Sequence, residues 1–121
     1  MTKILIADDS VSIRQLGAFT LKSGGYDCTE AEDGAKALAA CQSTEFDIVI
    51  TDLNMPNMDG MELVKNLRAD SNYAGTPILV LTTETDADKK AEGREAGVTG
   101  WIVKPFNPDS LLKAVARFAG D

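Results

Sequence analysis

Short runs of apolar residues alternate with amphipathic segments five times along the chain. Two of the runs, Ile48-Val49-Ile50 and Ile78-Leu79-Val80-Leu81, contain no polar side chain. Such continuous runs are typical of strands buried on both faces, as in the middle of a parallel sheet. The pattern predicts strands at residues 3–7, 26–30, 46–51, 77–81 and 99–103. The second is the most polar, which suits an edge of the sheet.

Cap residues and apolar periodicity predict a helix after each strand. Ser10 or Ser12 caps the first helix, in which Ile13, Leu16 and Phe19 recur at three-residue spacing and mark one apolar face. The other starts are expected near Asp33, Asp59, Asp86 and Asn107, the last followed by Pro108 at the first helical position.

The fourth helical pattern, residues 86–96, is weak because its apolar residues are mostly alanine and it contains Gly93. Strand and helix alternating five times nevertheless predict an α/β fold, with a parallel sheet covered by helices on both faces. A length of 121 residues fits one domain, residues 1–121.

Composition narrows the classes of function. A formal net charge of -7 disfavours nonspecific binding to nucleic acid, whose phosphates would repel the chain. No stretch approaches the roughly 20 apolar residues of a membrane span, and the first apolar run is too short for a signal peptide, so a cytoplasmic protein is expected. The absence of histidine excludes Ser-His and Cys-His catalysis, His-based zinc sites and a phosphohistidine on this chain.

Polar residues follow four of the five predicted strands. Asp8 and Asp9 come after the first, Asp52 closes the third, Thr82 follows the fourth and Lys104 follows the fifth. Ligands of open α/β sheets bind beyond these carboxyl ends, so we expect the side chains to share one pocket. Taken singly, each has a simpler role: an aspartate caps the next helix, a lysine is solvated, and a threonine hydroxyl serves a turn.

Three neighbouring carboxylates repel one another, and either protonation of one of them or a cation must offset that repulsion. At ~4 Å a like-charge pair costs about 4 kcal/mol at an effective dielectric of 20. Lys104 offsets one negative charge only. Mg²⁺, which favours carboxylates, waters and phosphate oxygens, fits the remaining excess.

Four segments carry a family resemblance: ILIADDS (residues 4–10), DLNMPNMDG (52–60), LTT (81–83) and VKPF (103–106). In order and spacing they closely resemble response-regulator receiver domains, particularly the CheY-like stand-alone members. The resemblance implies a flavodoxin-like five-stranded sheet of order 2-1-3-4-5 with five flanking helices. It also implies a two-component signalling protein, a phosphoprotein of chemotaxis, rather than an enzyme that turns over an external substrate.

The resemblance assigns roles in the pocket. Asp52 would be the phosphoacceptor. Asp9 and Asp52 would bind Mg²⁺ through their side chains, Asn54 through its backbone carbonyl, and Asp8 mainly through water.

It assigns further roles to Lys104 and Thr82. Lys104 would pair with the phosphoryl group and precede a cis peptide bond to Pro105. Thr82 would hydrogen-bond the phosphoryl group and move toward it, while Trp101 turns inward. Because indole is larger than the tyrosine or phenylalanine common at this position, a Trp101 packed on the surface without a switching role stays an equal alternative.

Three residues bear on the lifetime of the phosphorylated form. Thr83 stands where many relatives have alanine or glycine, beside the route of attacking water. Asn54 and Glu84 match positions linked in the family to rapid self-dephosphorylation. We expect a lifetime shorter than that of transcriptional regulators.

The partners follow from what this sequence lacks. The donor would be the phosphohistidine of a CheA-like histidine kinase. Without an output domain after residue 121, we expect readout through protein contacts near Trp101, with a flagellar motor switch protein or another phosphotransfer protein. A phosphate sink, a phosphorelay intermediate, an unphosphorylated pseudo-receiver and a haloacid dehalogenase-type phosphatase remain alternatives; the phosphatase usually needs an aspartate where this chain has Asn54.

Overall fold

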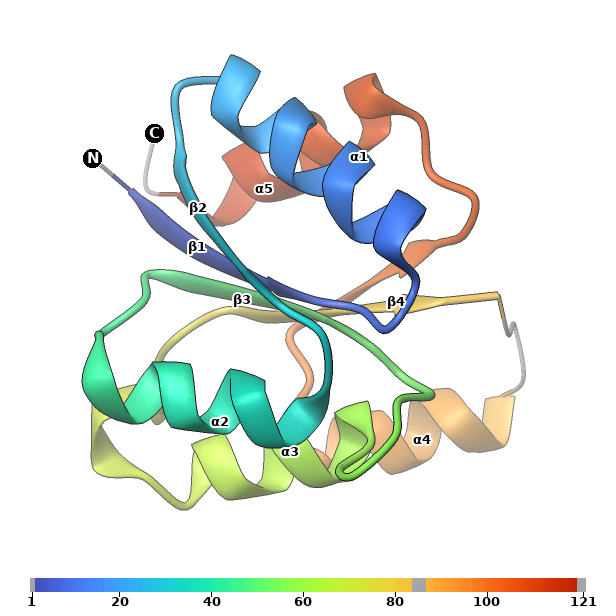
Figure 1. Ribbon diagram of the computed structural model, residues 1–121. Helices are drawn as coiled ribbons and strands as arrows, with labels where there is room; N and C mark the ends of the chain where they lie inside the picture. The colour runs from blue at the N-terminus through green and yellow to red at the C-terminus, as the bar shows by residue number, and fades with distance from the viewer. Residues whose placement is uncertain (1, 84–86, 120–121) are drawn as a thin grey trace.

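The computed structural model describes residues 2–83 and 87–119, and its centre is a parallel sheet (Figure 1). The strand order is β2-β1-β3-β4-β5, as the resemblance implies. The edge position of the polar second strand is confirmed. The strands are β1 (Lys3–Ala7), β2 (Asp27–Ala31), β3 (Ile48–Asp52), β4 (Ile78–Thr82) and β5 (Gly100–Val103).

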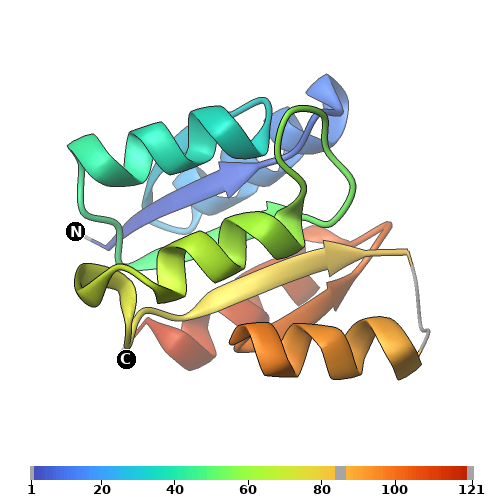
Figure 2. The same ribbon diagram turned by 90° about the horizontal axis from the view of Figure 1, so that it is seen from below.

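Helices cover both faces of the sheet, as predicted. One face carries α1 (Val11–Ser23) and α5 (Pro108–Phe118) (Figure 1). The other carries α2 (Gly34–Ser43), α3 (Gly60–Arg68) and α4 (Ala87–Ala96), side by side in Figure 2. A short 3-10 helix, η1 (Ser71–Tyr73), follows α3. No helix in the described ranges has the length and apolar character of a membrane span.

The predicted caps begin four of these helices. Ser10, rather than Ser12, is the cap of α1, and its hydroxyl accepts the Ile13 N–H. The side chains of Asp33, Asp59 and Asn107 likewise accept a backbone N–H three residues on. These bonds satisfy donors that a helix leaves free at its first turn. The predicted fourth start, residue 86, lies outside the described residues.

The apolar face predicted for α1 is wrong. Ile13 packs beside the core, but Leu16 is 41% and Phe19 73% exposed. Three-residue spacing falls about 60° short of a full helical turn at each step, so the stripe rotates away from the sheet. The buried face instead contains small residues and one leucine: Gly17, Ala18, Thr20 and Leu21.

The register of the sheet brings the carboxyl ends of its strands to the same level. β3 and β4 are buried along their whole length, as their apolar runs indicate. Ala7 pairs with Thr51, and Asp52 with Leu81, so β1, β3 and β4 end at one level. Thr82 pairs with Val103 in β5. The residues that follow these strands therefore share one edge.

Candidate functional site

Three carboxylates cluster at this edge of the sheet. One ligand oxygen from each of Asp8, Asp9 and Asp52 lies within 4.8 Å of the others. Asp8 is 0% and Asp52 7% exposed, whereas Asp9 is open to solvent. The strand-end reasoning thus predicted which acidic residues the fold brings together.

Lys104 is the cation of the cluster. Its ammonium nitrogen lies 3.0 Å from Asp8 Oδ2 and 3.2 Å from Asp52 Oδ2. Burial alone would lower the pKa of Lys104, but its hydrogen bond to Asp8 and the charge of Asp52 raise that pKa above its usual value. Lys104 is therefore held in its charged form between two buried carboxylates.

The negative charge of the cluster still exceeds what Lys104 offsets. Burial, followed by repulsion from Asp8, raises the pKa of Asp52 despite the opposing effect of Lys104. Neighbouring carboxylate charge thus contributes to both pKa shifts, after burial in the case of Asp52. A bound cation would relieve it.

Backbone hydrogen bonds fix two of the carboxylates and leave one buried oxygen to Lys104. The Leu53 N–H donates to Asp52 Oδ1 (2.8 Å), and the Ser10 N–H donates to Asp8 Oδ1 (2.9 Å). Asp8 Oδ2 is buried, and among the described residues its one polar partner is the Lys104 ammonium. A buried carboxylate oxygen with so few partners can accept a further ligand, such as a cation or a water. The donor set, carboxylate oxygens at one edge, fits Mg²⁺.

Gly60, at the end of the loop after β3, packs closely against the backbone of Asp52. The Gly60 N–H donates to the Leu53 carbonyl (2.8 Å), and a Cβ on Gly60 would lie 2.1 Å from the Asp52 carbonyl oxygen. Any side chain at Gly60 would therefore displace the backbone of Asp52. Gly60 was predicted at a helix start and within the DLNMPNMDG segment, but its contact with Asp52 could not be predicted without the fold.

Asn57 ties the same loop to α2. Its backbone has a positive φ of 68°, a conformation that asparagine tolerates better than most residues. Its side-chain amide donates to Asp33 Oδ2 (3.0 Å). The Lys36 N–H and the Asn57 amide lower the pKa of Asp33 by stabilising its charged form. Neither residue was predicted to support the site.

Arg14 is a second supporting residue that the sequence did not reveal. Its guanidinium donates to the Asp8 carbonyl (2.7 Å) and to Glu30 Oε1 (3.2 Å). It thereby holds the end of β1 against the end of β2. Only its place one turn into α1, after the aspartate pair, hinted at this position.

Three other predicted residues fall near the pocket. Thr82 is buried at the end of β4, and the following Thr83 is exposed. Asn54 is exposed two residues after Asp52. Glu84 lies outside the described residues. Their chemical roles stay predictions.

The remaining predictions concern β5 and the turn after it. Trp101 is half-buried on β5. The predicted cis peptide bond between Lys104 and Pro105 is confirmed.

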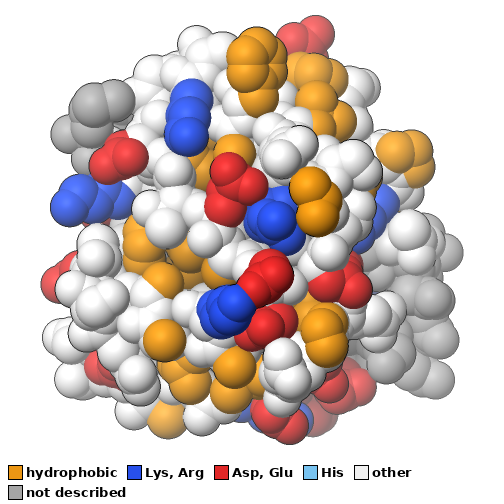
Figure 3. Space-filling model, viewed as in Figure 1, with side chains coloured by type: hydrophobic (Ala, Val, Ile, Leu, Met, Phe, Trp, Pro, Cys, Tyr) orange, Lys and Arg blue, Asp and Glu red, His pale blue; other side chains and the backbone are white. Residues whose placement is uncertain are grey.

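The surface beside the pocket mixes charges of both signs. Figure 3 shows acidic and basic side chains interspersed over α1, β2 and α2. Two ion pairs lie there, Arg14 with Glu30 and Lys36 with Glu32. These residues also line a shallow hollow of about 280 Å³. The visible face therefore offers no continuous basic patch for nucleic acid.

Comparison with known proteins decides the family. The model of the response regulator receiver domain matches residues 4–116, nearly the whole chain. The chain is a response-regulator receiver domain. It is 43% identical to chemotaxis protein CheY-3 of Vibrio cholerae over 95% of this chain and 89% of that protein. It is 39% identical to chemotaxis protein CheY of Pseudomonas aeruginosa, over 95% and 94%. This receiver domain is a two-component signalling regulator closely related to the CheY chemotaxis proteins.

Solved structures agree with the fold of the receiver domain. The chemotaxis protein CheY4 of Vibrio cholerae superposes with a TM-score of 0.95 at 53% identity, over 98% of each chain. The receiver domain of the Pseudomonas aeruginosa sensor histidine kinase PA1611 superposes with a TM-score of 0.91 at 26% identity, over 99% of this chain and 98% of that one. That structure has a magnesium ion coordinated in its active site cleft.

Proposed function

We propose that this receiver domain accepts a phosphoryl group on Asp52 with Mg²⁺ held by Asp8, Asp9 and Asp52. The observation that carries the proposal is the acidic cluster, in which three carboxylates lie beside the single ammonium group of Lys104. A cluster that only stabilised the fold would have its charges paired and its oxygens bonded. Asn54 would add a backbone carbonyl to the metal site.

The donor is a phosphohistidine on a histidine kinase, since this chain has no histidine. An Asp52 carboxylate oxygen forms the new O–P bond as the P–N bond to the imidazole breaks, and the imidazole nitrogen keeps the electron pair and takes up a proton. Bound Mg²⁺ would neutralise charge on the transferred group. Lys104 is placed to pair with the phosphoryl oxygens because it already lies 3.2 Å from Asp52.

Thr82 and the residues after it govern the fate of the phosphorylated form. Thr82 would hydrogen-bond the phosphoryl group from the end of β4. Hydrolysis of the acyl phosphate by water would reset the protein. Thr83 would lie beside the water's route, and Asn54 and Glu84 match positions linked in the family to rapid self-dephosphorylation. We therefore expect self-dephosphorylation within minutes rather than hours, without turnover of an external substrate.

Readout would use the surface around β5 and α5. A hollow of about 350 Å³ lies there, lined by Trp101, Ile102, Val103, Pro105, Phe106, Asn107, Ser110 and Ala114. Relation to CheY proteins favours a CheA-like kinase as donor and a flagellar motor switch protein as target in the cytoplasm. A phosphate sink or a relay to another phosphotransfer protein is the alternative within the same chemistry.

The test is phosphorylation with acetyl phosphate and Mg²⁺, read by intact mass. One added phosphoryl group is expected in the wild type and none in Asp52→Asn or in EDTA. Asp47→Asn, an exposed aspartate at the other end of the sheet, is the matched control and should be modified normally. Absence of an adduct when beryllium fluoride also fails to bind would overturn the proposal, and turnover of small phosphate esters would favour a phosphatase.

A further inference from the structure

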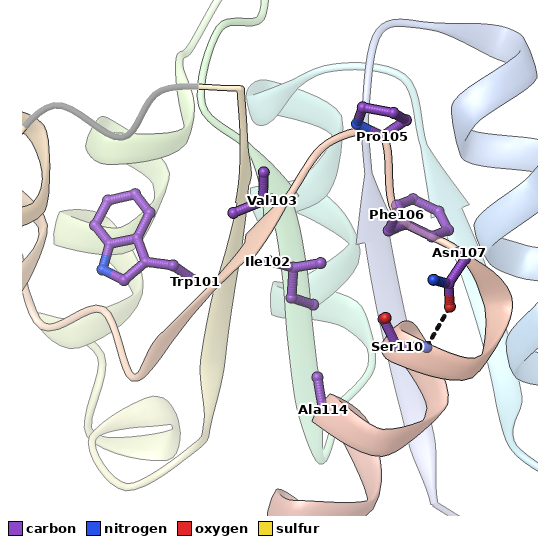
Figure 4. Close-up of a pocket in the computed structure, with 8 residues that line it drawn as sticks. All are labelled: Trp101, Ile102, Val103, Pro105, Phe106, Asn107, Ser110 and Ala114. Atoms are coloured by element: carbon purple, nitrogen blue, oxygen red, sulfur yellow. Dashed lines mark hydrogen bonds between the residues drawn. The ribbon is translucent and has the colours of Figure 1, made fainter.

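Trp101 faces the α4 side of the sheet. Its side chain packs against the core cluster beneath α2, α3 and α4, whereas the next residue, Ile102, belongs to the core on the α5 side. Figure 4 shows the indole pointing away from Ser110 and Ala114, which line the hollow beside α5. The contacts that hold the ring therefore come from the α4 side.

Gly93 of α4 supplies the space that the indole occupies. A Cβ built on Gly93 would lie 2.3 Å from Cζ2 and 2.8 Å from Cη2 of Trp101. Side-chain carbons do not approach this closely, so the ring and a side chain at position 93 exclude each other. Glycine is a poor helix residue, and this contact explains its presence within α4.

The backbone at Gly93 is fixed from two directions. The Gly93 carbonyl accepts the N–H groups of Gly97 (2.9 Å) and Val98 (2.8 Å), which close the helix with Gly97 at a φ of 106°. Arg68 of α3 donates to the Gly97 carbonyl (2.9 Å) and to the Thr99 hydroxyl (3.1 Å). Because the end of α4 is anchored, a side chain at Gly93 would move the indole rather than the helix.

We propose that Gly93 is the positioning residue of Trp101: its bare Cα forms a notch in α4 that seats the benzene edge of the indole. The orientation of the aromatic ring on β5 is then tied to the position of α4 by one contact. A larger ring on β5 is matched by a missing side chain on α4. Movement of either element unseats the other.

Fluorescence of Trp101, the only tryptophan, tests the notch directly. In Gly93→Ala without Mg²⁺ or a phosphoryl group, we expect red-shifted emission and faster quenching by acrylamide. Glu95→Ala is the matched control, because this exposed residue lies about 200° around α4 from Gly93. Emission and quenching unchanged in Gly93→Ala would overturn the proposal.

A double-mutant cycle supplies a second readout that needs no tryptophan signal. With Trp101→Phe as background, Gly93→Ala should raise the folding equilibrium constant about fivefold through helix propensity. In the wild-type background this gain should vanish or reverse. Equal gains in both backgrounds, or loss of folding in both, would contradict a notch specific to the indole. Neither readout depends on Asp52, so failure here is separable from failure of the phosphoacceptor proposal.

Discussion

At the carboxyl end of the sheet, Lys104 lies between two buried carboxylates, whereas at the amino end the partners of Arg68 among the described residues are neutral oxygens. The Arg68 guanidinium donates to the carbonyls of Tyr73 and Gly97, and burial lowers its pKa. The Tyr73 hydroxyl bonds backbone groups of Cys41, Thr44 and Phe46. The carboxyl end retains surplus negative charge, because three carboxylates lie beside one ammonium group.

This difference separates structural from functional polar groups. Polar atoms at the amino end are satisfied by the protein's own backbone, so they add stability and need no ligand. Those at the carboxyl end keep an excess of negative charge that a bound cation would offset. On the proposed function, the fold therefore accepts charge repulsion at one end in order to hold a binding site.

The largest contrast should appear when each end loses its cation. Lys104→Met is expected to slow phosphorylation by acetyl phosphate by about 10²–10³-fold, because it removes a charge placed beside the transferred group. Arg68→Met, the matched variant, should lower the melting temperature and leave the rate unchanged. Intact mass followed over time and thermal unfolding measure the two effects. Equal slowing of phosphorylation in both variants would contradict the proposed difference between the two ends of the sheet.

Cysteine reactivity gives the next largest effect. Burial raises the pKa of Cys28 to about 12 and that of Cys41 to about 11. Each pKa unit lowers the thiolate fraction about tenfold, so iodoacetamide at pH 8 should react at least about 100-fold more slowly than with unfolded chain.

A thiol at the carboxyl end is the control for this measurement. Thr83→Cys places one at an exposed position beside the pocket. Mass spectrometry over time should show one rapid and two slow modifications. The Cys41 carbonyl accepts the Tyr73 hydroxyl. Rapid labelling of Cys41 would therefore show that the amino end opens more readily than its hydrogen bonds indicate.

Much of this comparison could be anticipated from local sequence signals. Continuous apolar runs identified the central strands, and four cap residues marked helix starts. The carboxyl ends of the strands then identified Asp8, Asp52 and Lys104, because parallel strands bring those ends to one edge. The reasoning worked where a residue's neighbours along the chain determine its role.

Contacts between distant segments could not be anticipated in the same way. Tyr73 and Arg68 gave no signal, because their partners lie in segments remote along the chain. Gly60 and Gly93 are required by what approaches them, and glycine alone does not name the approaching group. Phe19 shows the opposite error: its apolar spacing predicted a buried side chain, but it is exposed, and the buried face of α1 consists mostly of small residues.

Loss of one hydroxyl should weaken the amino end measurably. The Tyr73 hydroxyl donates toward the carbonyls of Cys41 and Thr44 (2.9 Å each) and accepts the Phe46 N–H (3.2 Å). Tyr73→Phe leaves buried polar groups unpaired, so the free energy of unfolding should fall by about 1–3 kcal/mol in urea titrations. Tyr26→Phe should change it by less than about 0.5 kcal/mol. A similar small change in Tyr73→Phe would mean that water replaces the hydroxyl.

The smallest expected effect is a gain in the free energy of unfolding at the carboxyl end that the amino end does not share. Asp8→Asn keeps an acceptor for the Ser10 N–H and removes one of three like charges, so unfolding in EDTA should cost about 1 kcal/mol more than in the wild type. Asp47→Asn makes the same chemical change where the carboxylate accepts the Lys3 N–H, and it should give no gain. Adding Mg²⁺ should stabilise the wild type by mass action and Asp8→Asn much less. If Asp8→Asn instead destabilised the metal-free protein, its ion pair with Lys104 would outweigh the repulsion, and the carboxyl end would be as well satisfied as the amino end.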